Sequence, residues 1–476
     1  MKKLLCLLLA LLMVLPCTAC ANSGDDTETS AGTSDVTEAE TKEFFPDVQR
    51  TNYNETFQMI AMQRPVGEWY YAEELTNEVL NDAIYDMNQR VNDYLGVTIQ
   101  YENLTNIVTG GEVFTTVSPT IQAGDDAYQV CILHPYYSYN SFIGQNYAYD
   151  FYDLTSLDFD QAYWNKKVID QLAINDHAYI ALGDFCSYTL NILYVNKNLM
   201  KNAGRAMPYD KVRNGTWTED EFVSITKELY IDKDGDGKRN NADIYGFAGM
   251  WDANGSAMLQ ASDIYVATRN EDGMFELSLD STRLTDFYDK LFTWSKDEST
   301  YIWDYGNKFN TEKIAAFLDG HGYFTLEELG TQNLSADFDV GILPLPKYDV
   351  NQENYSHVNW GNNIVVPTTI KNPTMVGDVL EMMAYYSKTV VQQAYYDTVL
   401  QYKVSNAPDD REMVELIYDT VVYDPGIAFC DGNMGLWNLV YIACFGLTQN
   451  KTKIASYLKS NSKTAQKWLN DLFKDK

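Results

Sequence analysis

The sequence predicts an α/β fold in a body that begins near residue 44. Apolar residues with helical spacing alternate along the chain with short apolar or alternating runs that are typical of strands. Hydrophobic residues make up 45% of the 476 residues, which is enough for a large core and for two or more domains. Alternating strands and helices favour layered sheets with ligands at the strand ends.

The N-terminus predicts export from the cytoplasm. Lys2 and Lys3 precede an apolar run over residues 4–15, which is short for a membrane span and typical of a secretory signal. Small residues before Cys20 are typical of a bacterial lipoprotein cleavage site, although Cys17 stands where such sites usually have a leucine. We therefore expect residues 1–19 to be a signal peptide and Cys20 to carry lipid, which places the body outside the cell membrane. Ordinary secretion or a retained anchor is the alternative.

The composition of residues 20–47 predicts a flexible tether. They are rich in Ser, Thr, Gly, Asp and Glu and contain few large apolar side chains, so the segment cannot bury enough surface to offset its chain entropy. No later stretch is apolar and long enough to span a membrane. The membrane is therefore expected to be reached through the N-terminal lipid alone.

Charge and cysteine content exclude several classes of protein. The chain has 67 acidic and 35 basic residues, so nothing supplies a basic face for nucleic acid or for anionic lipid. The cysteines of the body are far apart, in apolar surroundings and without zinc-like spacing, which favours isolated buried thiols over disulfides. They are Cys131, Cys186, Cys430 and Cys444.

The elements of the body follow from local patterns. A helical stripe over residues 80–95 ends at Gly96, and the next residues alternate as a strand. Residues 127–134 read as a buried strand. A capping box of Thr218 and Glu221 predicts the start of another helix. Further helices are expected over 373–387 and 452–473, and a strand leading into a short helix over 191–204.

The segment "DKDGDGKRNNAD" predicts a calcium loop. Acidic residues at alternate positions around a sharp glycine turn provide the oxygen ligands that Ca²⁺ prefers. The closing residue is Asp where a longer Glu is usual, and a solvated acidic turn is the alternative reading. The predicted ligands are Asp232, Asp234, Asp236, the carbonyl of Lys238, Asn240 and Asp243.

The loop is expected to be structural. Calcium sensors usually pair two loops between helices, whereas here a helix precedes a single loop and the strand-like "IYGF" follows it. We therefore interpret the loop as a clip between a helix and a strand that starts near Ile244.

Several segments in order along the chain resemble the extracellular solute-binding proteins of ABC importers, in the group that includes maltose- and oligosaccharide-binding proteins. The segment "LYVNKNLMKNAG" is similar to a strand–helix passage of that family, and the calcium loop followed by "YGF" is similar to a frequent insertion in it. The other matching segments are 216–229, 313–324, 337–349 and 363–387.

This resemblance implies a two-lobed periplasmic-binding-protein-like fold with hinge crossovers. It implies an N-terminal lobe of residues 48–188 and 310–358 and a C-terminal lobe of residues 189–309 and 359–476. A solute would be held between the lobes and delivered to the permease subunits of the importer by a protein that acts as a monomer. Hinge closure in such a protein follows from a higher affinity of the ligand for the closed state.

The composition favours an oligosaccharide as the solute. Aromatic residues make up 14% of the chain, and flat rings match the apolar face of a sugar while polar side chains match its hydroxyl groups. Core packing of each ring, and plain surface charge for each acid, are the alternatives. The candidate ligand-binding residues lie in loops at crossovers and strand ends: Trp251, Trp360, Asp184, Tyr188, Trp303, Asp252, Asn362 and Tyr136.

Three other functions stay open. A surface carbohydrate-active enzyme would need two facing carboxylates, which an acidic chain cannot exclude, although no nucleophile or zinc-protease motif is present. A carbohydrate-binding protein without a transport role is the second. A binding protein for peptides, amino acids or polyamines is the third, because the acidic balance suits a cationic ligand. We expect a binding protein and no catalytic residue.

Overall fold

The computed structural model describes most of the body that begins at Phe45. The described residues are 45–62, 69–104, 111–134, 139–186, 188–240, 242–250, 253–279, 281–303, 317, 319–329, 336–359, 361–395, 407–429, 439 and 454–474. Among the helices in these ranges, none combines the length and the hydropathy needed to cross a bilayer.

The first sheet has four strands in the order β12-β3-β1-β2. Strand β1 pairs in parallel with both β2 and β3, and β12 joins the edge of β3 in the antiparallel direction. The strands are β1 Glu55–Met62, β2 Val97–Leu104, β3 Val130–Leu133 and β12 Asn363–Val365.

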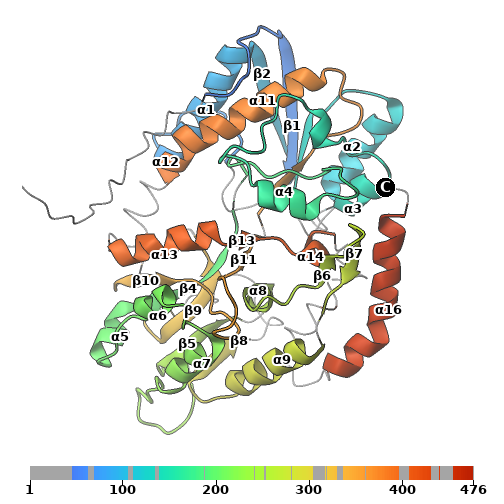
Figure 1. Ribbon diagram of the computed structural model, residues 1–476. Helices are drawn as coiled ribbons and strands as arrows, with labels where there is room; N and C mark the ends of the chain where they lie inside the picture. Colours follow the sequence, from blue (N-terminus) through green and yellow to red (C-terminus); the bar gives the residue numbers. More distant parts are fainter. Residues whose placement is uncertain are drawn as a thin grey trace, which may run out of the picture. The chain divides into compact units, whose positions relative to one another are not determined.

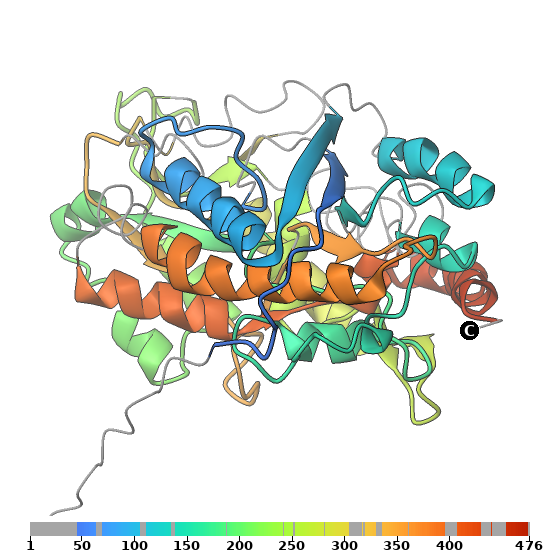
Figure 2. The ribbon, with the colours of Figure 1, turned by 90° about the horizontal axis from the view of Figure 1, so that it is seen from above.

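Helices from both ends of the body cover the first sheet. Helices α1 and α11, far apart in sequence, pack against each other and lie side by side in both ribbon views (Figures 1 and 2). A π-helical turn, η2, follows α11 and also packs on α1. The elements of this layer are α1 Val79–Leu95, α2 Glu112–Ala123, α3 Tyr139–Gly144, η1 Phe151–Asp153, α4 Lys166–Leu172, α11 Pro373–Tyr386, η2 Ser387–Val391 and α12 Gln392–Tyr395.

The second sheet has five strands in the order β10-β4-β9-β5-β8. Strand β4 pairs antiparallel with β10 and β9, whereas β5 pairs in parallel with β9 and β8. The strands are β4 Asn191–Asn196, β5 Tyr245–Met250, β8 Thr300–Trp303, β9 Gly322–Glu328 and β10 Val340–Leu343.

The remaining elements surround the second sheet or extend from it (Figure 1). Helix α7 packs on β5, α8 on β9, α9 on β8 and α13 on β10. Two small sheets pair β6 Ala267–Arg269 with β7 Phe275–Leu277 and β11 His357–Val358 with β13 Val421–Val422. The helices are α5 Lys197–Asn202, α6 Tyr209–Arg213, α7 Glu219–Lys227, α8 Ala253–Ala261, α9 Ser281–Ser295, α13 Pro408–Asp419, α14 Pro425–Ala428 and α16 Ile454–Leu472.

The sequence signals act where they were expected. Helix α1 ends at Gly96, whose φ of +60° is the left-handed conformation that glycine adopts without a Cβ penalty. The Thr218 hydroxyl accepts a hydrogen bond from the Glu221 N–H at 3.4 Å and caps α7. The Glu221 carboxylate lies 3.0 Å from the Lys211 ammonium, and the hydrogen bond from its backbone N–H to Thr218 is one half of the predicted capping box. Cys131 and Cys186 are buried free thiols, as predicted; Cys430 and Cys444 lie outside the described residues.

Strand pairing corrects the predicted division of the chain between the two lobes. Strands β9 and β10 were assigned with 310–358 to the N-terminal lobe, but they pair on either side of β4 in the second sheet. Strand β12 was assigned with 359–476 to the C-terminal lobe, but it pairs with β3 in the first sheet, and α11 packs on α1. The reason is that strand partners are set by hydrogen bonding between distant segments, which family-like order along the chain does not reveal.

Candidate functional site

Two segments connect the two sheets and are joined to each other by two isolated backbone bridges. Residues 181–190 lead into β4, and residues 359–364 lead into β12. Ala181 and Ile364 exchange backbone hydrogen bonds of 3.2 and 3.0 Å, and Leu190 forms a second bridge with Asn359. We call this pair of segments the crossover strip. Hinge motions concentrate in the few residues that connect rigid layers, and this strip is one such connection among the described residues.

Asn359 links both segments of the crossover strip. Its side-chain oxygen accepts hydrogen bonds from the backbone N–H groups of Thr189 at 2.9 Å and Gly361 at 2.7 Å. Its Nδ2 donates to the hydroxyl of Tyr423 at 3.1 Å, and that hydroxyl donates to Asn363 Oδ1 at 2.6 Å. Asn359, Tyr423 and Asn363 are all buried. Asn359 therefore joins the two segments of the strip through a buried hydrogen-bond network.

Asp184 is a buried carboxylate within the strip. It is 5% exposed, and its Oδ2 lies 3.4 Å from the ammonium of Lys388 on the π-helical turn η2. This Oδ2 has no hydrogen-bond partner among the described residues, so the pair is an ion pair without hydrogen-bond geometry. Burial raises the pKa of Asp184 to about 7, against the opposing effect of Lys388.

Tyr188 begins a row of aromatic rings beside the strip. Its ring meets the ring of Tyr418 edge to face, with centroids 5.6 Å apart. The Tyr418 hydroxyl donates to the Tyr395 hydroxyl at 3.4 Å, and the Tyr395 ring lies 4.5 Å from that of Trp69. We call Tyr188, Tyr418, Tyr395 and Trp69 the aromatic row. It draws on the strip, α13, α12 and the segment after β1, and it joins apolar ring surface to phenol hydroxyls, which is the chemistry a sugar requires.

The other predicted ligand residues are partly outside the described chain. Asn362 is 3% exposed within the crossover strip. Trp303 is the last residue of β8 and stands opposite Met250, the last residue of β5, so the two parallel strands end together. Trp251, Trp360, Asp252 and Tyr136 lie outside the described residues, and so does the lipidation candidate Cys20.

Three aspartates of the predicted calcium loop converge. Asp232, Asp234 and Asp236 each offer a carboxylate oxygen, and these oxygens lie within 4.8 Å of one another. The Asp232 carboxylate accepts from the N–H groups of Gly235 at 2.8 Å and Gly237 at 2.9 Å, and both glycines have positive φ. Hydrogen bonding, first of all from Asn240, lowers the pKa of Asp234. This donor set fits a hard cation such as Ca²⁺.

Asp243 has a different place from the three converging aspartates. It is fully buried, and it accepts hydrogen bonds from the Tyr230 hydroxyl at 3.0 Å and the Asn240 N–H at 3.0 Å. Asn240 also donates to the Lys238 carbonyl at 3.3 Å. The loop thus closes on itself through Asp243. A backbone bridge between Ile231 and Ile244 joins its two ends.

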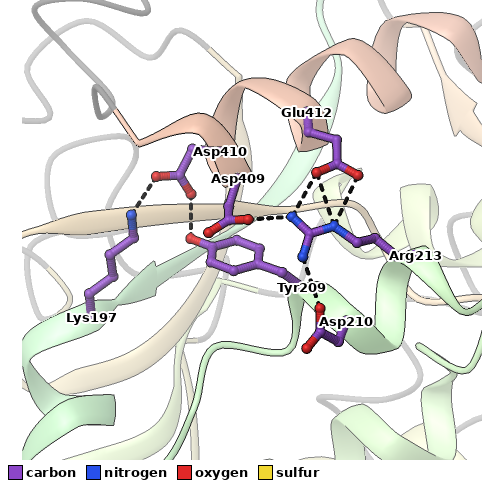
Figure 3. A network of polar contacts seen from close by, with 7 residues as sticks. All are labelled: Lys197, Tyr209, Asp210, Arg213, Asp409, Asp410 and Glu412. Atoms are coloured by element: carbon purple, nitrogen blue, oxygen red, sulfur yellow. Dashed lines mark hydrogen bonds and ion pairs between the residues drawn. The ribbon is translucent and has the colours of Figure 1, made fainter.

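A polar cluster fixes α13 to the second sheet (Figure 3). Asp410 is fully buried; it pairs with Lys197 and accepts hydrogen bonds from the Tyr209 hydroxyl at 2.5 Å and the Ile342 N–H at 3.0 Å. Burial and the neighbouring carboxylate raise the pKa of Tyr209. Because Lys197, Tyr209 and Ile342 belong to the layer of the second sheet, α13 belongs to that layer too.

Arg213 completes this α13 cluster at the surface (Figure 3). Its guanidinium donates to Asp210 at 2.9 Å, to Glu412 at 3.0 and 2.6 Å, and to Asp409. The adjacent Asp409 and Asp410 occupy the first turn of α13, where carboxylates are favoured by the helix dipole. The sequence signal that identifies this acid pair is the proline at the start of the helix, followed by two acids.

The chain has the fold of the solute-binding proteins of ABC transporters. No family model and no curated protein sequence matches it. Its structure is similar to that of an ABC substrate-binding protein from Listeria monocytogenes in complex with cycloalternan, with a TM-score of 0.58 at 14% identity over 87% of this chain and 99% of that one.

Two further solved structures show the same similarity. One is the galacto-N-biose/lacto-N-biose I-binding protein of an ABC transporter from Bifidobacterium longum, in complex with lacto-N-biose, with a TM-score of 0.56 at 12% identity over 88% of this chain and 98% of that one. The other is the GacH receptor of Streptomyces glaucescens, with a TM-score of 0.55 at 13% identity over 88% of this chain and 99% of that one. The α/β fold with two mixed sheets is thereby confirmed.

Proposed function

We propose that this protein is the substrate-binding component of an ABC importer and captures an oligosaccharide between its two sheet layers. One observation carries the proposal: nearly the whole body matches ABC solute-binding proteins in fold, and several of these were solved with sugars bound. Within the aromatic row, Trp69 and Tyr395 are buried, and the partly exposed Tyr188 and Tyr418 support a sugar, since a phenol ring offers flat surface and a hydroxyl group together.

Isothermal titration with a panel of defined oligosaccharides, among them maltotriose and mannobiose, tests this function. We expect at least one sugar to bind and to raise the melting temperature by mass action, without being consumed. Chromatography of the sugar after incubation provides the control for turnover. Hydrolysis of the sugar would favour the carbohydrate-active enzyme instead, and binding of polyamines or peptides in place of sugars would refute the oligosaccharide.

The aromatic row gives the sharper test of where the sugar binds. Tyr188→Ala removes one ring, and the loss of about 0.5–1.5 kcal/mol typical of a ring contact weakens the affinity about twofold to twelvefold. Tyr152→Ala is the matched control, because this exposed tyrosine lies in η1 and outside the aromatic row. Equal affinities of the two variants would remove the aromatic row from the binding site.

We further propose a location and a partner that follow from this role. The protein is held at the outer face of the cell membrane by lipid on Cys20 and delivers its solute to the permease subunits. Metabolic labelling with palmitate should mark the wild-type protein and leave Cys20→Ala unlabelled. Labelling of both proteins would refute lipidation at this residue.

We also propose that the 232–243 loop binds Ca²⁺ as a structural clip. The converging aspartates support this, and outside the cell the ion is plentiful enough to keep a weak site filled. A chelator is expected to lower the melting temperature of the wild type and to have no effect on Asp234→Ala. Asp272→Asn, an exposed acid outside the loop, serves as the control and should respond as the wild type does. A chelator response that persists in Asp234→Ala would contradict the site.

A further inference from the structure

The segment of residues 73–79 is exposed over its whole length. It leads from the core residues before it into helix α1, and we call it the entry segment. Two of its side chains are apolar: Leu75 is 61% exposed, and Val79, the first residue of α1, is 57% exposed. Single apolar side chains at a surface are common, but two on one short segment concentrate apolar surface at one place, which is typical of an interaction site.

Hydrogen bonds to the first turn of α1 give the entry segment a defined shape. The Thr76 N–H donates to Asp82 Oδ1 at 2.8 Å, and Asn81 Nδ2 donates to the Glu74 carbonyl at 2.8 Å. Asn77 takes the left-handed conformation with a φ of +64°, which asparagine tolerates better than most residues. The segment therefore folds back on the helix that it enters.

A buried asparagine fixes the base of the entry segment. Asn88, in the middle of α1, is 1% exposed; its Oδ1 accepts from the Ala72 N–H and its Nδ2 donates to the Tyr70 carbonyl, each at 3.0 Å. The chain is thus held in place both before and after the segment. A binding segment that is already ordered loses less conformational entropy when it meets a partner, so this arrangement favours recognition.

The charge of the entry segment limits the partner that it fits. Glu73, Glu74 and Glu78 are exposed, and the segment contains no basic residue. An anionic lipid surface would repel it, and a symmetric contact with a second copy would bring the same acids together. A protein surface with basic side chains around an apolar pocket is complementary, because the carboxylates then pair at the rim while Leu75 and Val79 fill the centre.

We propose that the entry segment docks this protein on the permease subunits of its importer, at an extracytoplasmic surface where basic side chains surround an apolar pocket. The inference rests on the proposed function, which supplies this partner. Trp69 of the aromatic row lies only four residues before the segment in the chain. Docking at the segment therefore brings the proposed sugar site close to the permease.

Photo-crosslinking in living cells tests the docking without knowledge of the solute. A photo-reactive benzoylphenylalanine replaces Leu75 in the full-length protein, expressed in the cells from which the gene comes. We expect irradiation to link it to a protein that mass spectrometry identifies as a permease subunit. The matched control carries the same group at Val350, which is 64% exposed between β10 and β11, and should give no such product. Links only to lipid or to a second copy, or equal permease yields from both positions, would overturn the docking.

Uptake of the sugar that binds in titration provides the second test. In cells whose own copy of the gene is deleted, Leu75→Asp and Glu78→Lys should each lower uptake at least about tenfold, a loss typical of a side chain at the centre of an interface. Leu75→Asp places a charge in the apolar pocket, and Glu78→Lys reverses a charge at its rim. Both variants should bind the sugar as the wild type does, because neither residue belongs to the aromatic row. Val350→Asp should support uptake at the wild-type rate.

The outcomes distinguish a failure of the docking from a failure of the proposed function. Wild-type uptake by both Leu75→Asp and Glu78→Lys overturns the docking even though the sugar binds. Loss of sugar affinity together with uptake also overturns it, because the segment would then belong to the sugar site. If no sugar binds, the oligosaccharide is refuted, and the crosslinking result alone decides the docking.

Discussion

Replacement of His357 by glutamine should make the protein more resistant to acid. His357 is 1% exposed, and each of its two ring nitrogens has a hydrogen-bonding partner. Its Nε2 accepts from the Leu345 N–H at 3.1 Å, so this nitrogen carries no proton, and its Nδ1 lies 2.9 Å from the Thr420 hydroxyl. The folded protein therefore holds a neutral imidazole, and burial lowers its pKa to about 3.

The sign follows from counting protons in each state. The unfolded chain protonates this histidine below about pH 6.5, whereas the folded chain resists protonation down to about pH 3. Stability therefore falls as the pH drops through that window, by about 1.4 kcal/mol per pH unit and about 5 kcal/mol in all. Above pH 7 both states are neutral and this contribution to pH dependence vanishes.

Urea unfolding from pH 7.5 to 4.5 provides the assay. At pH 7.5, the free energy of unfolding of His357→Gln should be about 1–3 kcal/mol lower than that of the wild type, because the glutamine amide does not reproduce the hydrogen-bond geometry of the imidazole ring. The difference in unfolding free energy between the wild type and this variant should shrink and then reverse as the pH falls, since glutamine does not titrate. Thr420→Val is the control: it removes the hydroxyl at Nδ1 but keeps the imidazole, so its deficit should keep the pH slope of the wild type. Parallel curves for wild type and His357→Gln would refute the neutral buried imidazole.

Three further substitutions test packing and hydrogen bonding by urea unfolding at neutral pH. Asp410→Asn should cost about 3–5 kcal/mol, because it leaves a partly buried lysine without its counter-charge; a change below 1 kcal/mol would show that the α13 cluster is dispensable. Asn359→Ala should cost about 2–4 kcal/mol, since two buried N–H groups lose their acceptor, and normal stability would contradict the network. Gly246→Ala should destabilise severely, as its Cβ would stand 2.0 Å from the Thr226 carbonyl oxygen, whereas Gly144→Ala, with 3.5 Å of room, should be tolerated; similar losses in both would refute the packing.

Local structure was predictable from the sequence because its causes are local. Helix α1 and strand β2 follow from apolar spacing and from one glycine, Gly96, that can adopt a positive φ. The loop from Asp232 and the bridge before β5 follow from the spacing of aspartates and glycines. In the helix and in the loop most of the hydrogen bonds join residues within a few positions of each other, so the pattern contains the information.

The assignment of strands to sheets was not predictable in the same way. Strands β9 and β10 are apolar and short, and nothing in their residues distinguishes a place beside β4 from a place in the other sheet. The decision depends on pairing across more than a hundred residues. A resemblance in segment order gives the elements and the two layers, but it left the boundaries between them wrong.

Some residues of the candidate site were predictable from the sequence, and others were not. Asp184 and Tyr188 were chosen because they lie at a crossover, and the structure does place them in the strip and in the aromatic row. Asn359 and Lys388 were missed, since neither stands in a motif. The role of Asn359 comes from a hydrogen bond to a backbone N–H that is 170 residues away in sequence, and that of Lys388 from its place on a π-helical turn. Polar networks of this kind are visible only once burial is known.

The α13 cluster and the crossover strip together define what can move. Helix α13 is held to the second sheet by Asp410 at one end, while Tyr418 near its other end meets Tyr395 of the first layer. Because the cluster is buried and charged, it is costly to break, whereas the contact between two tyrosine hydroxyls at 3.4 Å is weak. A rotation of the layers should therefore separate α13 from α12 and leave α13 on β10. The aromatic row would then change with the hinge, and a sugar bound there would select one hinge state by its contacts, as differential affinity requires.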